Sequence, residues 1–175
     1  MAAALGPHYG AVVVAHSFGG LVLPLVDARA HVYLCAFVPT PGVAPGELFR
    51  EALDPGFTGT ERDELGRSYW PSVDVAVERL YAGHERRWAE WAFPRLRPQG
   101  QGGVREPHPL TAFPATPAAS IVARGDASIR PEWSRARARE VLRVEPLEID
   151  GGHFPMLDRP DELADLLERG LEDLP

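Results

Sequence analysis

The order of apolar and polar positions along the chain predicts an α/β fold with a mainly parallel sheet. Four short apolar runs, at residues 11–15, 31–37, 120–123 and about 143–149, are separated by more polar stretches. Continuous apolar runs of this length are typical of strands that are buried on both faces. The first two runs leave room for one helix, which indicates a right-handed βαβ unit. Pro146 interrupts the fourth run and favours an edge strand.

Helices are predicted after three of these strands. A helix over 131–142 has proline in its first turn, and a final amphipathic helix over 160–171 repeats leucine at helical spacing. A third helix should begin near Ser17, directly after the first strand. Pro24 lies well inside it and should kink or shorten it.

Residues 42–117 differ from the rest of the chain. Helical patterns cover 74–80 and 85–96, but the segment holds no convincing strand. It concentrates six large aromatic residues, namely Tyr69, Trp70, Tyr81, Trp88, Trp91 and Phe93. We therefore predict a core made of 1–41 and 118–175, with 42–117 inserted as a helical lid over a pocket.

Composition excludes several classes of function. The 175 residues suit one domain, and 25 acidic against 18 basic residues give a net charge of −7. This balance argues against nucleic acid as a partner. Every basic residue is arginine, so mechanisms that require a lysine amine are excluded.

The single cysteine, Cys35, excludes an intramolecular disulfide and a four-cysteine zinc site. We expect it to be a buried, inert thiol within a strand, and we expect neither a metal nor a cofactor. The N-terminus lacks the features of a signal peptide, and no apolar run is long enough to span a bilayer. These features predict a soluble cytoplasmic protein that binds no membrane.

One motif carries chemistry. Ala15, His16, Ser17, Phe18 and Gly19 form a small-x-Ser-x-Gly sequence directly after an apolar strand. A nucleophilic serine at a sharp strand-to-helix turn needs small residues two positions before and after it. Such a turn exposes the hydroxyl at the carboxyl edge of the sheet, and the following helix can offer an N–H to an oxyanion. The alternative interpretation is an ordinary turn with a helix-capping serine.

The remaining chemistry fits the chain order serine, acid, histidine. Asp126 follows the third predicted strand and His153 follows the fourth. Asp150 is the alternative acid, although its place just before His153 favours a role in shaping the loop. The other five histidines are interpreted as structural or solvated residues, namely His8, His16, His31, His84 and His108.

Several segments together resemble the α/β-hydrolase fold family. They are AVVVAHSFGG, YLCAFVPTPG, WAFPRLRPQ, ARGDASIRPEW and GGHFPMLDRPDELADLL. More narrowly, they are similar to plant-type methyl esterases (salicylate methyl ester hydrolases), hydroxynitrile lyases and their bacterial relatives. The resemblance implies Ser17 as nucleophile, Asp126 as acid and His153 as base. It also implies the Phe18 backbone N–H as an oxyanion donor.

The sequence leaves three functions to compare. The first is hydrolysis of a small, largely apolar carboxylic ester through Ser17, His153 and Asp126. The second is a non-catalytic, hydrolase-like domain. The third, hydroxynitrile cleavage, is disfavoured because that activity in the family relies on a lysine beside the histidine, whereas Phe154 stands here and the chain has no lysine.

Only 16 residues precede Ser17, whereas the family places several strands before its nucleophile. We therefore expect that N-terminal strands of the family fold are missing, together with the second oxyanion donor. The first predicted strand then has a bare apolar edge, formed by Ala11, Val12, Val13, Val14 and Ala15. Such an edge is a template for pairing, which predicts self-association through residues 11–15.

Overall fold

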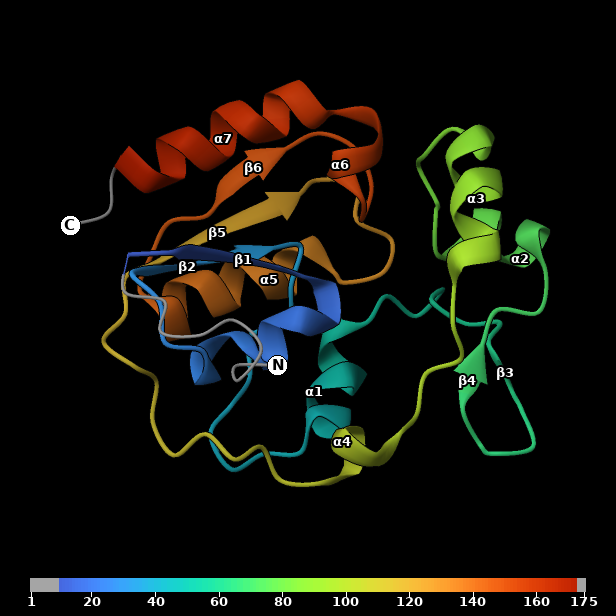
Figure 1. The fold of residues 1–175 in the computed structure, drawn as a ribbon, viewed down its shortest axis with the longest axis horizontal. Coiled ribbons are helices and arrows are strands. Elements are labelled where there is room, and N and C mark those ends of the chain that lie inside the picture. The colour runs from blue at the N-terminus through green and yellow to red at the C-terminus, as the bar shows by residue number, and fades with distance from the viewer. Residues whose placement is uncertain (1–9, 173–175) are drawn as a thin grey trace.

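The computed structural model describes residues 10–172, and its centre is a four-stranded parallel sheet (Figure 1). Its strands are β1 (Val12–His16), β2 (Ala30–Leu34), β5 (Ala118–Ala123) and β6 (Leu147–Ile149). They lie in the order β1-β2-β5-β6, and every neighbouring pair is parallel. The predicted fold class and all four predicted strands are confirmed, and β6 lies at an edge as Pro146 suggested.

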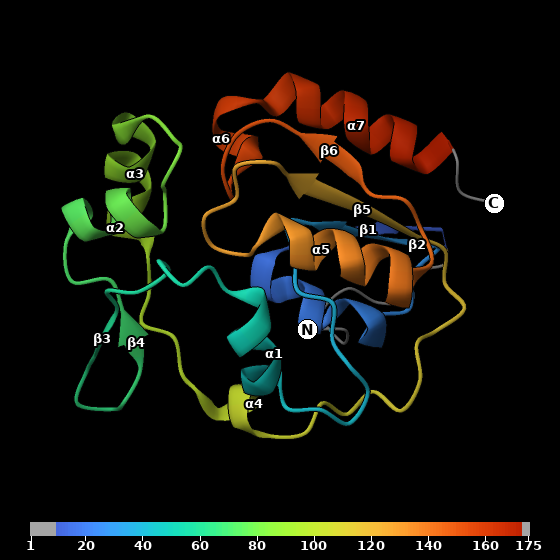
Figure 2. The same ribbon diagram turned by 180° about the vertical axis from the view of Figure 1, so that it is seen from behind.

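Helices cover both faces of the sheet (Figures 1 and 2). On one face, α7 (Pro160–Glu172) packs Leu163 and Leu166 against apolar side chains of β2, β5 and β6. Burial of each leucine contributes about 1.5–3 kcal/mol. On the other face lies α5 (Pro131–Arg137), which continues as a π-helix over Ala138–Leu142. Every residue of β2 is buried, which explains why its sequence is apolar apart from His31, whose Nε2 lies 2.9 Å from the Val26 carbonyl oxygen.

The helix predicted after β1 is wrong in type. Ser17–Leu21 and Leu23–Leu25 are two short 3₁₀ helices rather than one α-helix. Pro24 stands at the beginning of the second, where its missing N–H costs nothing. Instead of kinking one continuous helix, Pro24 therefore lies in a second, separate 3₁₀ helix.

The inserted segment, residues 42–117, holds helices α1 (Pro45–Ala52), α2 (Val73–Arg79), α3 (Arg86–Ala92) and α4 (Gly102–Arg105). Contrary to prediction it also contains a hairpin, formed by β3 (Glu61–Arg62) and β4 (Ser68–Tyr69). These two-residue strands carry no apolar alternation, so no pattern of the kind that predicts a strand marks them. Figure 1 shows α2, α3 and the hairpin together at one side of the sheet. The division into core and lid stays a prediction.

β1 is the other edge of the sheet within residues 10–172, and Val14 on it is 44% exposed. Self-association through residues 11–15 stays a prediction. Across the described part of the chain, no helix has both the length and the apolar character needed to cross a bilayer. The cytoplasmic location also stays a prediction.

Candidate active site

Ser17 stands at the turn where β1 ends and the first 3₁₀ helix begins. Its φ is +53°, in the left-handed region that L-residues rarely occupy. A non-glycine residue there costs about 1–2 kcal/mol, so the surrounding structure must hold it in place. The Ser17 carbonyl accepts a hydrogen bond from the Phe37 N–H at 3.1 Å, which ties the turn to the chain after β2.

Two glycines follow Ser17, and they differ in how strictly space requires them. A Cβ added to Gly19 would meet the Ala15 Cβ at 3.6 Å, an ordinary contact. A Cβ added to Gly20 would lie 2.2 Å from the Phe37 carbonyl oxygen. The steric demand that the motif placed on Gly19 therefore falls mainly on Gly20, where the turn meets the backbone beyond β2.

Ser17 and His153 lie within hydrogen-bond distance, although 136 positions separate them. The Ser17 Oγ is 2.8 Å from the His153 Nε2, and the His153 Nδ1 is 2.7 Å from the Asp126 Oδ2. A carboxylate only accepts, so Nδ1 carries the proton and the neutral ring leaves its Nε2 lone pair for the serine hydroxyl. This is the arrangement in which an imidazole can remove a proton from serine.

Asp126 is held rigidly by the backbone after β5. It is 6% exposed, and its Oδ1 accepts hydrogen bonds from the N–H groups of Ser128 at 2.8 Å and Ile129 at 2.9 Å. Its two oxygens therefore have separate tasks. Oδ1 fixes the carboxylate, and Oδ2 faces His153.

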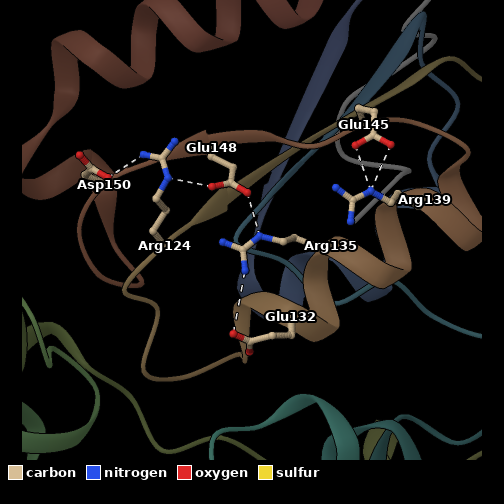
Figure 3. Close-up of polar contacts among 7 residues, drawn as sticks. All are labelled: Arg124, Glu132, Arg135, Arg139, Glu145, Glu148 and Asp150. Atoms are coloured by element: carbon tan, nitrogen blue, oxygen red, sulfur yellow. Dashed lines mark hydrogen bonds and ion pairs between the residues drawn. The ribbon is translucent and has the colours of Figure 1, made fainter.

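Asp150, the alternative acid, points elsewhere. Figure 3 shows it directed at Arg124, with 2.6 Å between Asp150 Oδ1 and Arg124 Nη1. Arg124 also binds Glu148 on β6, which in turn accepts from Arg135 on α5 at 2.7 Å. This network joins the edge of the sheet to α5, and the hydrogen bond from Arg135 holds the pKa of Glu148 below its ordinary value. The structure thus brings Asp126, and not Asp150, to His153.

A cavity of about 650 Å³ opens above Ser17. Its volume lies within the usual range for pockets that bind small molecules. Apolar side chains from the core and from α1 line one part, among them Phe18, Phe37, Phe49, Leu53 and Ile129. Of the six aromatic residues singled out in the inserted segment, Tyr69, Trp70 and Phe93 line the cavity, whereas Tyr81 is buried and Trp91 is 53% exposed. Among the described residues that line it, Arg97 alone is an arginine, aspartate or glutamate.

The chain matches the family model described as "Alpha/beta hydrolase family" over residues 2–166. It belongs to the alpha/beta hydrolase family. The resemblance drawn from the sequence is thereby confirmed. No curated protein sequence gives a significant match to this hydrolase.

Solved structures of similar fold include several esterases. Polyneuridine aldehyde esterase has a TM-score of 0.77 at 19% identity, over 95% of this chain and 74% of that one. The methylesterase MES16 from Arabidopsis has a TM-score of 0.74 at 17% identity, over 97% and 72%. A pyrethroid hydrolase from Sphingobium faniae JZ-2 has a TM-score of 0.68 at 17% identity, over 96% and 73%. At such identities the likeness shows the shared fold.

Two of the other histidines lie beside the site, His16 because it directly precedes Ser17, and His84 without any signal in the sequence. The His16 Nε2 is 2.8 Å from the His153 carbonyl oxygen, and the Phe154 N–H donates to the His84 Nε2 at 3.1 Å. Burial, reinforced by the nearby His153, lowers the pKa of His16 to about 4. His31 and His108 bind backbone carbonyls elsewhere, and His8 lies outside the described residues.

Cys35 is 2% exposed, and burial raises the pKa of its thiol to about 12, as expected of an inert cysteine. Its expected place within a strand is wrong, because β2 ends at Leu34 and the Cys35 φ of +43° lies outside the β region. Within residues 10–172, no group of three or more His, Cys, Asp and Glu side chains is arranged to hold a metal ion.

Proposed function

We propose that this hydrolase cleaves carboxylic esters, with Ser17 as nucleophile, His153 as general base and acid, and Asp126 as the group that orients His153. The observation that carries the proposal is the continuous chain of contacts from Ser17 Oγ through His153 to Asp126, with distances of 2.8 and 2.7 Å. Ser17 and His153 also line a largely apolar cavity, which supports the same assignment.

The reaction proceeds in two halves. Ser17 Oγ attacks the ester carbonyl carbon while His153 Nε2 takes the hydroxyl proton, and the carbonyl oxygen becomes an oxyanion. Phe18 is the second residue of the 3₁₀ helix Ser17–Leu21, where the first N–H groups lack intrahelical partners, and its N–H would donate to this oxyanion. His153 then protonates the departing alcohol, and the acyl group stays on Ser17. A water oxygen next attacks the acyl carbon while His153 Nε2 takes a water proton, and His153 gives that proton to Ser17 Oγ as the carboxylic acid leaves.

The cavity supports a largely apolar ester as substrate. The phenylalanine, leucine and isoleucine side chains that line the cavity with Ser17 favour apolar acyl or alcohol groups, and a single guanidinium, that of Arg97, offers little to balance a dianion. The cavity also extends to polar side chains on the inserted segment, including Ser68 and Gln101. An uncharged aromatic or short acyl ester should therefore bind better than a phosphorylated one.

A serine-reactive fluorophosphonate and a p-nitrophenyl ester test the proposal together. The folded protein should turn over the ester, and peptide mass spectrometry should find the phosphonate on Ser17. Ser17→Ala should abolish both, whereas Ser68→Ala, which removes another serine of the cavity, should keep the adduct on Ser17. A folded protein that neither reacts with the probe nor cleaves any ester would instead be the non-catalytic domain considered above.

A further inference from the structure

The peptide bond that follows the candidate catalytic histidine is held at both ends by other histidines. At one end, His16 Nε2 lies 2.8 Å from the His153 carbonyl oxygen. At the other, the Phe154 N–H points to His84 Nε2 at 3.1 Å. A carbonyl only accepts and an amide N–H only donates. His16 therefore presents a protonated Nε2, and His84 presents an unprotonated one.

Asp158 explains why His84 can accept. Its Oδ2 lies 3.0 Å from the His84 Nδ1, and the His84 side chain is completely buried. A carboxylate acceptor places the proton on Nδ1 and leaves Nε2 free. Asp158 thus orients His84 just as Asp126 orients His153. The Asp158–His84 pair ends on the Phe154 backbone amide, whereas the Asp126–His153 pair ends on Ser17.

The loop that carries His153 packs directly on His84. A Cβ added to Gly152 would lie 2.6 Å from the His84 Nε2 and 2.6 Å from the Ala82 carbonyl oxygen. The Phe154 ring stacks on Tyr81 with 4.8 Å between the ring centroids. The His84 ring is therefore part of the tightly packed surface on which this loop rests, and we expect a change at His84 to shift the loop.

We propose that His84, oriented by Asp158, is a positioning residue for the hydrolysis. By holding the Phe154 N–H, it fixes the peptide plane after His153 and so keeps His153 Nε2 directed at Ser17. The inference rests on the proposed function, because it concerns the same reaction. It also assigns the inserted segment a part in aligning the site, in addition to lining the cavity.

Two substitutions at position 84 separate positioning from general packing. In His84→Gln, the Oε1 can reach the place of Nε2 and accept from the Phe154 N–H. In His84→Asn, the shorter amide cannot. His108→Asn is the matched control, since His108 is another buried histidine of the inserted segment, bonded to the Leu21 carbonyl away from His153. Each protein is titrated with the phosphonate, so that kcat refers to active sites alone.

His84→Asn should lower kcat per active site by about 10- to 100-fold, as expected for a small misplacement of a catalytic group, with KM nearly unchanged. His84→Gln should recover most of that loss. His108→Asn should lower thermal stability while leaving kcat per active site unchanged. Equal kcat in His84→Asn and the wild type, or equal losses in the Asn and Gln variants, would overturn the inference.

Nitrogen-15 NMR of the wild-type protein supplies a reading that does not depend on catalysis or on the folding of a variant. His84 should show a protonated Nδ1 and an unprotonated Nε2, and the Phe154 amide should exchange slowly. A protonated Nε2 on His84 would refute the contact itself. If the wild type cleaves no ester and Ser17 is not labelled, the proposed function fails and this role in it fails too. If the wild type is active and only the His84 results disagree, the inference alone fails.

Discussion

Exchange of one oxygen for an NH₂ group at Asp126 should remove most of the activity while the fold remains. In Asp126→Asn, one atom of the amide must face the N–H groups of Ser128 and Ile129, and the other must face His153. If the oxygen keeps the two backbone bonds, the NH₂ group meets the His153 Nδ1. The ring then carries its proton on Nε2 and cannot accept the proton of Ser17.

The opposite orientation would preserve the working ring but would leave two buried N–H groups facing a donor. Each such loss costs about 1–3 kcal/mol, so the flipped amide is disfavoured by at least about 2 kcal/mol. That difference leaves roughly one molecule in 30 with the working arrangement. A serine hydrolase whose histidine is fixed in the wrong tautomer loses about 10⁴ in kcat. We therefore expect a loss between about 30-fold and about 10⁴-fold.

The assay is p-nitrophenyl ester turnover per phosphonate-titrated site, with thermal denaturation measured alongside. Asp150→Asn is the matched control, because Asp150 pairs with Arg124 at the surface and should leave kcat unchanged. Retention of kcat within about threefold in Asp126→Asn would refute the reasoning about orientation. An equally large loss in Asp150→Asn would show that the acid has been assigned to the wrong residue.

Two further predictions concern the packing and protonation of the same loop. Gly152→Ala places a Cβ 2.6 Å from the Ala82 carbonyl oxygen, so overpacking should lower the unfolding free energy by about 1–3 kcal/mol, measured by urea denaturation; an unchanged midpoint would contradict the tight packing. His16 has its folded pKa lowered from 6.5 to about 4, so the unfolded chain binds more protons there, and stability should fall as the pH drops from about 6.5 to about 4. Over this pH range, the lowered pKa of His16 should account for a loss of about 3 kcal/mol in unfolding free energy. His16→Gln, whose amide can still donate to the His153 carbonyl, should lose that part of the pH dependence. Identical profiles of unfolding free energy against pH in the wild type and the variant would refute this prediction.

The strands and the three polar residues of the site could be predicted because their signals are local. β1, β2 and β5 are continuous apolar runs, and Ser17, Asp126 and His153 each follow a strand of the parallel sheet. The carboxyl ends of parallel strands meet at one edge, so chain order alone predicts that the residues after them lie near one another.

The elements that the sequence did not predict depend on contacts made elsewhere in the fold. The hairpin of β3 and β4 has exposed or half-buried residues and no apolar pattern. The π-helical turn at Ala138–Leu142 ends at Arg143, whose φ of +62° is unusual for a residue with a side chain. The His84 contact joins residues 70 positions apart, and neither neighbouring sequence marks it.

Under the proposed function, the reaction type and the choice of substrate therefore depend on different parts of this fold. The reacting groups need only a sheet edge and three short loops, and their identity is visible in a few letters of sequence. The cavity wall is assembled from Phe37 after β2, Phe49 on α1, Trp70 after β4 and Phe154 beside His153. Under the proposed function, a substitution in this wall should change which ester fits while Ser17, His153 and Asp126 keep their mutual distances. Selection for new substrates should accordingly act on the inserted segment, α1 included, except at His84, where the same segment reaches the peptide that follows the proposed base.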